Sequence, residues 1–318
     1  MNREVVRRRV PPAASLSSPG RHRAHPVTDP GGGHVLDDAA AARLAPLLHS
    51  PSSTAILVDF DGTLAPIVED PASARPLPEA ETVLRELARR FKVVAVVSGR
   101  PLAFLTDRLP AADGVALVGL YGLERSGTVD GPDALVPGRA ARRWRPVVVG
   151  VVDRLRAVLP AEVGVEDKGM TTAVHWRRRP DLAELARAAV AEEAARTGLV
   201  AHDGRMSVEL RPPLGVDKGS TVTDLVRGCT AACFLGDDLG DLPAFDVLDA
   251  LSASGAMDTV TVAARDRESA PEVLAAADLV VPGPAGALDV LAWLADRADR
   301  ADRADGADRA DGADGSPD

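Results

Sequence analysis

The sequence predicts an α/β protein: a doubly wound core with a parallel sheet, interrupted by an inserted α+β cap. Three observations support this fold class. Apolar runs of about five residues alternate with amphipathic segments, as in parallel strands that are covered on both faces. Between residues 125 and 208 the predicted strands come in adjacent pairs, which is typical of an antiparallel insert. After Lys218 the first pattern returns.

The first half of the core begins with the apolar run ILVDF at residues 56–60. A Pro-rich loop follows, and then the amphipathic segment ETVLRELARR at residues 81–90, which predicts a helix. A second strand is predicted at Val93–Val97 and a third at Val115–Gly119. The order strand, helix, strand indicates a right-handed βαβ unit.

The cap and the second half of the core follow from the same patterns. In the cap we expect helices over residues 141–159 and 180–197, with strands around 163–166, 171–176, 199–202 and 206–210. The core then resumes with a helix through 222–226, a strand at 231–235 and a closing helix near 285–295. The predicted core therefore comprises residues 37–124 and 209–295, and the cap comprises residues 125–208.

Both ends of the chain are compositionally biased. Residues 1–36 are rich in Arg, Pro, Ser and Gly, and they predict a disordered leader without the apolar stretch of a secretory signal. Residues 296–318 repeat Ala-Asp-Arg and Ala-Asp-Gly, a low-complexity pattern that predicts a disordered, solvated tail.

Composition also limits the classes of function. The chain has 318 residues and a formal net charge of −10, which argues against nucleic acid as the main partner. No apolar stretch reaches the roughly 18 residues of a membrane span, so we expect a soluble protein that does not bind membranes. Two cysteines, Cys229 and Cys233, fit buried free thiols in a reducing cytoplasm and do not suffice for a zinc site. A monomer is expected.

Polar side chains follow the predicted core strands at the points where these strands end. Ligands of open α/β sheets bind beyond the carboxyl ends of the strands, so these side chains should converge. The residues are Asp59 and Asp61 after the first strand, Ser98 after the second, Asp237, Asp238 and Asp241 after the strand that follows the cap, and Lys218 at a helix start.

Several carboxylates beside one lysine and one hydroxyl suit a metal ion and an anion. Two like charges held close together are unfavourable unless a cation or a proton relieves them. Mg²⁺ prefers oxygen ligands, and Asp59 and Asp237 could bind it while Asp61 remains free to carry a proton. A carboxylate can also act as a nucleophile in phosphoryl transfer, with the metal and Lys218 neutralising the phosphoryl oxygens.

The same residues carry a resemblance to a known family. The segments DFDGTL at 59–64 and GDDLGD at 236–241, with Ser98 and Lys218 between them, resemble the four ordered motifs of the haloacid dehalogenase superfamily of phosphatases. More narrowly, the chain resembles the trehalose-6-phosphate phosphatases. That narrower resemblance rests on DFDGTLAPIVEDPASARPLPE, VVSGRP, GLYGLE, EDKGMTTAVHWR, VELRPPLGVDKG and GDDLGDLPAF, and it extends over about residues 53–295.

The resemblance implies a haloacid dehalogenase-like core and a Mg²⁺-dependent hydrolysis of trehalose 6-phosphate through an aspartyl-phosphate, as part of trehalose biosynthesis. It also implies a role for each matching residue. Asp59 resembles the nucleophile and Asp61 the general acid/base, while Ser98 and Lys218 resemble the pair that holds the phosphate. The metal ligands would be Asp59, Asp237 and the backbone carbonyl of Asp61, and the carboxylates that position them would be Asp238 and Asp241. The groups that hold the sugar would be Lys168, Glu209, Arg211, Glu124 and Arg100.

Two departures from the family pattern affect the expected site. Tyr121-Gly122 stands where the family often has His-Gly, and Gly240-Asp241-Leu242 stands where it often has Thr-Asp-Glu. His175 and Trp176 are expected to pack inside the cap, and no role is expected for His202.

Alternatives remain open at the level of the sequence. The spacing of Glu209 and Arg211 also fits a plain ion pair on one face of a strand. The protein could be a phosphatase of the same superfamily that acts on another sugar phosphate, because the cap determines the substrate. It could also be a non-catalytic sugar-phosphate sensor, although such a sensor would tolerate the loss of Asp61.

Overall fold

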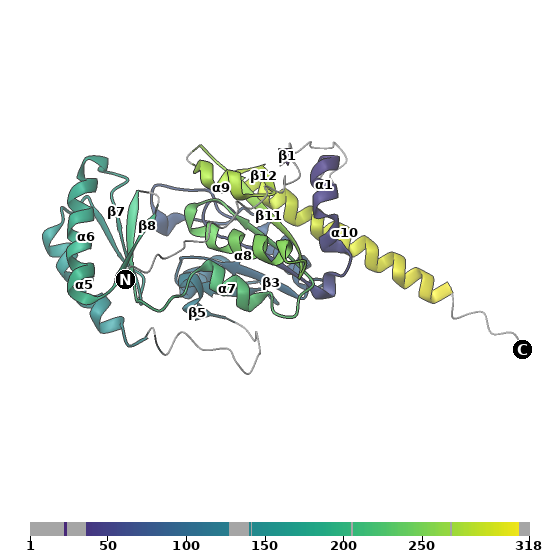
Figure 1. Ribbon diagram of the computed structural model, residues 1–318, viewed down its shortest axis with the longest axis horizontal. Helices are drawn as coiled ribbons and strands as arrows, with labels where there is room; N and C mark the ends of the chain where they lie inside the picture. Colours follow the sequence, from purple (N-terminus) through teal and green to yellow (C-terminus); the bar gives the residue numbers. More distant parts are fainter. Residues whose placement is uncertain are drawn as a thin grey trace, which may run out of the picture.

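The structure is a computed structural model of the whole chain. It describes residues 22–23, 36–126, 140, 142–204, 206–267 and 269–311. The molecule has two lobes (Figure 1): a large core and a smaller lobe around α5, α6, β7 and β8, which we call the cap. Among the described residues, no helix has the length and apolarity needed to cross a membrane.

The core is built around one eight-stranded sheet. Its strand order is β1-β12-β11-β10-β2-β3-β4-β5, and every neighbouring pair is parallel except β4 and β5. The strands are β1 (His22–Arg23), β2 (Thr54–Val58), β3 (Val93–Val97), β4 (Ala116–Gly119), β5 (Glu124–Arg125), β10 (Ala231–Gly236), β11 (Asp258–Arg265) and β12 (Leu279–Pro282).

Helices cover both faces of this sheet, which explains why its strands are continuous apolar runs. Ile56 and Val58 of β2 pack in one apolar cluster with residues of α2 and α10. Ala55 and Leu57 point to the opposite face and pack with residues of α7 and α8. The core helices are α1 (Asp38–Leu44), α2 (Ala80–Ala88), α3 (Leu102–Arg108), α7 (Lys218–Leu225), α8 (Leu242–Ala253), α9 (Pro271–Ala276) and α10 (Gly283–Asp311).

The direction of winding reverses between β2 and β10. From β2 the chain proceeds through β3 to β4 on one side, whereas from β10 it proceeds through β11 to β12 on the other. The carboxyl ends of β10, β2 and β3 are therefore neighbours at the switch point, the usual ligand-binding position of a doubly wound sheet.

The cap contains a separate antiparallel sheet of four strands in the order β6-β7-β9-β8. One face of this sheet packs on helices: Val174, Val208 and Leu210 share an apolar cluster with residues of α5 and α6. The cap elements are α5 (Arg145–Val158), β6 (Gly164–Asp167), β7 (Thr172–His175), α6 (Ala183–Thr197), β8 (Val200–Gly204) and β9 (Ser207–Arg211).

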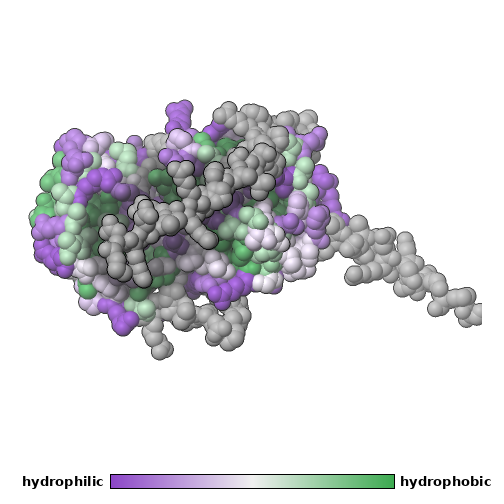
Figure 2. All heavy atoms as spheres, in the orientation of Figure 1, coloured by the Kyte–Doolittle hydropathy of each residue, from purple (hydrophilic) through white to green (hydrophobic). Residues whose placement is uncertain are grey.

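The predicted fold class is confirmed: a mostly parallel core sheet with helices on both faces, and a separate antiparallel sheet with two helices. The exact domain boundaries at residues 37, 125, 209 and 295 stay predictions, and residues 127–139 of the expected cap lie outside the described part of the chain. On the face drawn in Figure 2, hydrophilic residues lie along much of the outline of both lobes.

The expectation of a disordered tail is wrong for residues 296–311, which continue helix α10. Ala and Arg favour helices, and Asp296 forms an i,i+4 ion pair with Arg300. Ala298 is buried against the core, and Asp299 pairs with Arg90 beside α2. Figure 1 shows the helix leaving the core lobe. Residues 312–318 lie outside the described part.

The expected leader is also structured at two residues, because β1 pairs with β12 through His22 and Arg23. The other residues of 1–35 lie outside the described part. Helix α1 follows, with Asp37 as its N-cap residue: the Asp37 carboxylate accepts a hydrogen bond from the backbone N–H of Ala40 at 2.8 Å.

Candidate active site

A cleft of about 320 Å³ lies between the carboxyl edge of the core sheet and the cap sheet. The core contributes its strand-end residues, and the cap contributes one face of its sheet. The predicted site residues that line this cleft are Asp59, Asp61, Ser98, Arg100, Lys168, Glu209, Arg211, Lys218, Asp237 and Asp238.

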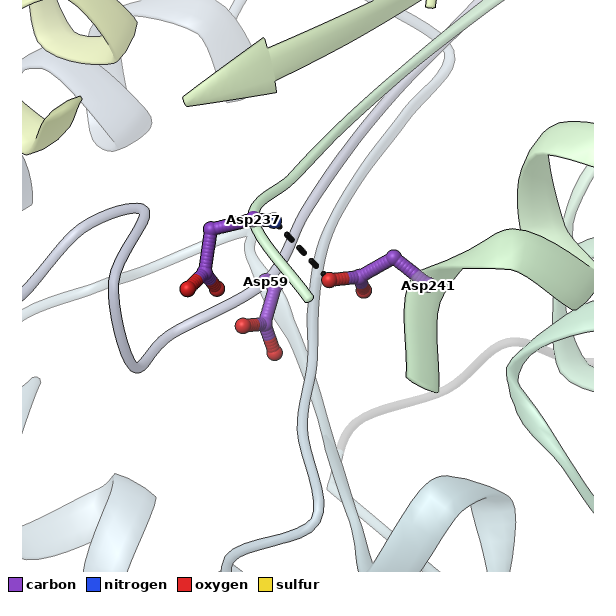
Figure 3. A group of neighbouring side chains, drawn as sticks. All are labelled: Asp59, Asp237 and Asp241. Carbon is purple, nitrogen blue, oxygen red and sulfur yellow. Dashed lines mark hydrogen bonds between the residues drawn. The ribbon is translucent and has the colours of Figure 1, made fainter. Parts of the chain in front are cut away.

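Three carboxylates meet at the core end of the cleft. Oxygen atoms of Asp59, Asp237 and Asp241 all lie within 4.8 Å of one another. Figure 3 shows the Asp59 and Asp237 carboxylates side by side, with Asp241 reaching toward them from the segment that leads into α8. All three residues are buried, so their charges are poorly screened by water.

Donors of the protein occupy both carboxylate oxygens of Asp241. Its Oδ2 accepts hydrogen bonds from the backbone N–H groups of Asp237 at 2.9 Å and Asp238 at 3.1 Å, and its Oδ1 accepts from Lys218 at 2.5 Å. Asp238 in turn accepts from the backbone N–H of Gly240 at 2.8 Å. These bonds hold the loop after β10 in one conformation.

Lys218 places a positive charge between two of the carboxylates. Its Nζ lies 2.6 Å from Asp59 Oδ1 and 2.5 Å from Asp241 Oδ1. Burial by itself would lower the pKa of Lys218, but Asp241 and Asp59 raise that pKa well above its ordinary range. Burial raises the pKa of Asp59 well above its usual value, and Lys218 offsets only part of that rise.

The backbone conformation of Gly62 brings the loop after β2 close to the loop after β10. Gly62 has φ +81°, and a Cβ atom there would lie only 2.1 Å from Asp237 Oδ2. Only glycine therefore lets the loop after β2 approach Asp237 so closely. The short turn of DFDGTL is needed for the carboxylates to meet.

The chemistry of this group fits a small divalent cation. Its ligand atoms are carboxylate oxygens, the ligands that Mg²⁺ prefers, and one or two carboxylates are the usual protein share of a magnesium site. The donor bonds to Asp241 favour the expected supporting position for that residue over direct coordination.

Asp61 was expected to be free, but it has a charged partner. Both of its carboxylate oxygens accept hydrogen bonds from the Arg100 guanidinium, each at 2.7 Å. Arg100, which was expected to hold the sugar, thus holds Asp61. Asp61 nevertheless lines the cleft together with Asp59, just beyond Val58, where β2 ends.

Ser98 lies at the end of β3, where the predicted phosphate-holding hydroxyl was expected. It is buried, and its Oγ accepts a hydrogen bond from the backbone N–H of Arg100 at 3.1 Å. Its own hydroxyl proton is thereby directed away from that N–H group. Ser98 also lines the cleft, directly after the end of β3.

The cap sheet turns a polar face toward the core. Pairing aligns Glu166 with Ala173, Ala173 with Glu209 and Glu209 with His202 in one row across four strands. All four residues line the cleft, whereas the alternate residues of the strands pack on α5 and α6. The small side chain of Ala173 leaves space in the middle of this row.

Glu209 is the most strongly held residue of the cap face. Its carboxylate accepts hydrogen bonds from the Thr171 hydroxyl at 2.6 Å, the Tyr121 hydroxyl at 2.8 Å and Arg211 at 3.1 Å, and Lys168 Nζ lies 3.6 Å away. Burial would raise the pKa of Glu209, but Lys168, Arg211 and the two hydroxyls outweigh burial and lower the pKa to about 2.

The low pKa of Glu209 leads to a prediction about the free energy of unfolding. The interval between its ordinary pKa of 4.5 and about 2 corresponds to about 3 kcal/mol, present above pH 4.5 and lost as the pH falls toward 2. We expect Glu209→Gln to lower the free energy of unfolding by an amount of that order at pH 7. Urea unfolding at pH 7 and at pH 3.5 should show a smaller difference at the lower pH; an equal difference at both would contradict the assigned pKa.

Two residues differ from their expected positions. Glu124 does not line the cleft; its carboxylate accepts a hydrogen bond from the backbone N–H of Leu102 at the start of α3, at 2.7 Å. His175 was expected to pack inside the cap, but it lines the cleft with its Nε2 3.0 Å from Glu166 Oε2. Trp176, by contrast, packs in the apolar cluster of the cap.

Sequence reasoning missed Glu166, His175, Arg177 and His202 as cleft residues. The signal was available in part. His175 and Arg177 alternate with Val174 and Trp176, so the period of two along β7 and the two residues after it separates a polar face from an apolar one. Which face meets the core could not be read from that alternation.

Comparisons with known proteins agree with the resemblance seen in the sequence. The family model Trehalose-phosphatase matches residues 57–275. The trehalose-phosphate phosphatase of Mycolicibacterium paratuberculosis is 35% identical over 254 residues, which cover 76% of this chain and 62% of that protein. The trehalose-phosphate phosphatase of Mycobacterium tuberculosis (strain H37Rv) is 38% identical over 206 residues, which cover 61% of this chain and 51% of that protein.

Solved structures show the same fold. The C-terminal domain of Candida albicans trehalose-6-phosphate phosphatase superimposes with a TM-score of 0.65 at 23% identity, covering 80% of this chain and 96% of that one. A trehalose-6-phosphate phosphatase related protein gives a TM-score of 0.59 at 23% identity, covering 76% and 96%.

The matched region spans only about half to 62% of the length of these curated relatives. Within this chain, however, the family model covers the end of β2, the core strands from β3 to β5, β10 and β11, the cleft loops and the whole cap sheet. The chain belongs to the trehalose-phosphatase family.

Proposed function

We propose that this protein is a Mg²⁺-dependent phosphatase that hydrolyses trehalose 6-phosphate to trehalose and phosphate. The observation that carries the proposal is the cleft itself. A cation-binding group of carboxylates and a buried lysine lie at one end, and a polar sheet face large enough to line a sugar lies at the other. Family membership supports the same substrate class.

In the proposed reaction Asp59 attacks phosphorus and the sugar oxygen leaves, which gives an aspartyl-phosphate on Asp59; water then attacks phosphorus and releases phosphate. When bound, Mg²⁺ supplies positive charge beside the phosphoryl oxygens. Lys218 and Ser98 hold the phosphoryl group against Asp59. The attacking atom is positioned by the hydrogen bond from Lys218 to Asp59 Oδ1, which leaves Oδ2 available.

Asp61 moves the protons. It donates one to the leaving sugar oxygen and later removes one from the attacking water. Both carboxylate oxygens of Asp61 accept hydrogen bonds from Arg100 in this arrangement. For Asp61 to transfer a proton, Arg100 must therefore release it or turn toward the phosphate of the substrate. Arg100 lines the same cleft, so its guanidinium can exchange Asp61 for a substrate phosphate.

The test is phosphate release by the purified protein from a panel of sugar phosphates, with Mg²⁺ and with EDTA. A strong preference for trehalose 6-phosphate that EDTA abolishes would support the whole proposal. Preference for a different sugar phosphate would keep the catalytic residues and replace the substrate. No release from any member by a folded protein would favour the non-catalytic sensor.

Glu209 should distinguish sugar recognition from phosphoryl transfer. We expect Glu209→Ala to raise KM for trehalose 6-phosphate about 10-fold to 100-fold, because hydrogen bonds to a charged group are lost. KM for a small aryl phosphate, which does not reach the cap, should change less than about threefold. Steady-state kinetics with both substrates checks this.

The matched control is Glu184→Ala on the exposed side of α6, which should leave both substrates unaffected. Equal effects of Glu209→Ala on the two substrates would reduce Glu209 to a structural ion-pair partner of Arg211 and Lys168.

A further inference from the structure

Tyr121 joins the core to the cap within the cleft. It lies in the short turn between β4 and β5, with a positive φ of 62°, which is uncommon for a residue other than glycine. Its side chain crosses to the cap, where the hydroxyl donates to Glu209 Oε2 at 2.8 Å. The two residues are 88 positions apart in the chain.

The backbone of Tyr121 is tied to the phosphate end of the cleft. Its N–H donates to the carbonyl of Ser98 at 2.9 Å, and its carbonyl accepts from the Thr221 hydroxyl at 2.6 Å. Thr221 belongs to α7, the helix that starts with Lys218. One residue therefore contacts the strand end that carries Ser98 and the helix that carries Lys218.

The ring of Tyr121 contacts a second cap residue. The guanidinium carbon of Arg211 lies 3.3 Å from the ring centroid, and Arg211 also donates to Glu209 at 3.1 Å. Gly99 makes room for this ring, since a Cβ at position 99 would lie 2.4 Å from the Tyr121 hydroxyl. The position of the ring is thus determined by both lobes.

We propose that Tyr121 is a positioning residue that sets the distance between the phosphate-holding groups and the sugar-contacting pair Glu209 and Arg211, and thereby selects phosphorylated sugars of one length. This inference rests on the proposed function and deepens it. The Tyr121 hydroxyl donates to Oε2 of Glu209, whereas the Thr171 hydroxyl donates to Oε1, so the core and the cap hold different oxygens of this carboxylate. Burial and the neighbouring Glu209 raise the pKa of Tyr121 well above its usual value, so it remains a donor at every working pH.

The first experiment compares Tyr121→Phe with Thr171→Val. Both remove one hydroxyl donor from Glu209, but the Thr171 donor belongs to the cap and the Tyr121 donor belongs to the core. We expect Tyr121→Phe to lower kcat/KM for trehalose 6-phosphate about tenfold or more, with less than a twofold change for a small aryl phosphate. Thr171→Val should have a smaller effect on the disaccharide.

The panel of sugar phosphates tests the length selection. Tyr121→Phe should reduce the preference for trehalose 6-phosphate over glucose 6-phosphate, measured as the ratio of their kcat/KM values. The reason is that the distance between the phosphate-holding groups and the sugar-contacting pair is then less tightly fixed. Equal losses on all substrates, equal effects of the two variants, or no loss at all would each overturn the proposal.

A second readout does not depend on turnover. Tyr121 is the single tyrosine of the chain, so 3-fluorotyrosine labelling gives one ¹⁹F resonance for this position. We expect the resonance to shift in Glu209→Gln and, in the wild type, on addition of trehalose. A resonance that moves in neither case would overturn the Tyr121–Glu209 link.

The two readouts separate the inference from the proposed function. If the wild type hydrolyses the aryl phosphate without preferring trehalose 6-phosphate, the proposed substrate fails. The inference then survives only if Tyr121→Phe still changes the ratios within the panel and the ¹⁹F shift in Glu209→Gln is present; otherwise it is overturned as well.

Discussion

Asp59→Asn is expected to abolish phosphate release, lowering kcat by about 10⁴-fold or more, while the protein stays folded. An amide cannot form the acyl-phosphate, and removal of a nucleophile from a catalytic group that acts as a unit has effects of this size. The fold should persist, because an asparagine oxygen can still accept the hydrogen bond that Lys218 donates to Asp59 Oδ1 at 2.6 Å. Steady-state kinetics with trehalose 6-phosphate and with an aryl phosphate should show the same loss.

Stability should not fall in this variant. Burial raises the pKa of Asp59, so its ionised form is unfavourable in the folded state, and a neutral amide removes that penalty. Thermal unfolding without Mg²⁺ should give a Tm equal to or above that of the wild type. The control is Asp113→Asn at an exposed position, which should leave kcat and Tm unchanged. Wild-type turnover by Asp59→Asn would refute the covalent route.

Lys218→Met is expected to impair both activity and folding. Without the lysine, Asp59 and Asp241 are two buried carboxylates with no cation between them, and loss of one partner from a buried ionic group typically destabilises by about 3–5 kcal/mol. Turnover should fall about 10³-fold or more, since the phosphoryl oxygens also lose their fixed positive charge. Urea unfolding in EDTA measures the first effect, and phosphate release in saturating Mg²⁺ measures the second.

The pH dependence of the Lys218→Met deficit has a definite sign. The folded-state pKa values of Asp59 and Asp241 lie above their ordinary values even with Lys218 present, and its removal raises them further. The penalty for ionised carboxylates is therefore present at pH 8 and disappears as the pH falls through these pKa values. Lys218 itself has a raised pKa, so its own contribution is complete throughout this range and is lost only at higher pH.

The stability deficit of the variant should accordingly be largest at pH 8 and should become smaller as the pH is lowered. Lys92→Met, which replaces an exposed lysine, should change stability by less than about 0.5 kcal/mol at either pH. A deficit of Lys218→Met that grows as the pH falls would show that the lysine does not compensate the two carboxylates.

The order of elements and the composition of the core end of the cleft could be predicted from the sequence. Apolar runs such as Val93–Val97 are long enough to identify buried strands, and the strand-end rule then places Ser98, Asp59 and Asp237 at one edge. Both steps succeed because strand identification needs only a short segment of sequence, and the strand-end rule holds for doubly wound sheets in general. The prediction for residues 296–311 was wrong because a low-complexity repeat can still form a helix when it contains Ala, Arg and Asp–Arg pairs four residues apart.

The residues at the strand ends can be read from the local pattern of the chain, whereas their pairing depends on how distant segments pack in the folded protein. Asp61 pairs with Arg100 across 39 positions, Lys218 with Asp59 across 159, and Tyr121 with Glu209 across 88. Spacing in one segment carries no information about such pairs. They form where packing of helices on both faces of the sheet, and of the cap against its edge, brings distant loops within hydrogen-bond distance.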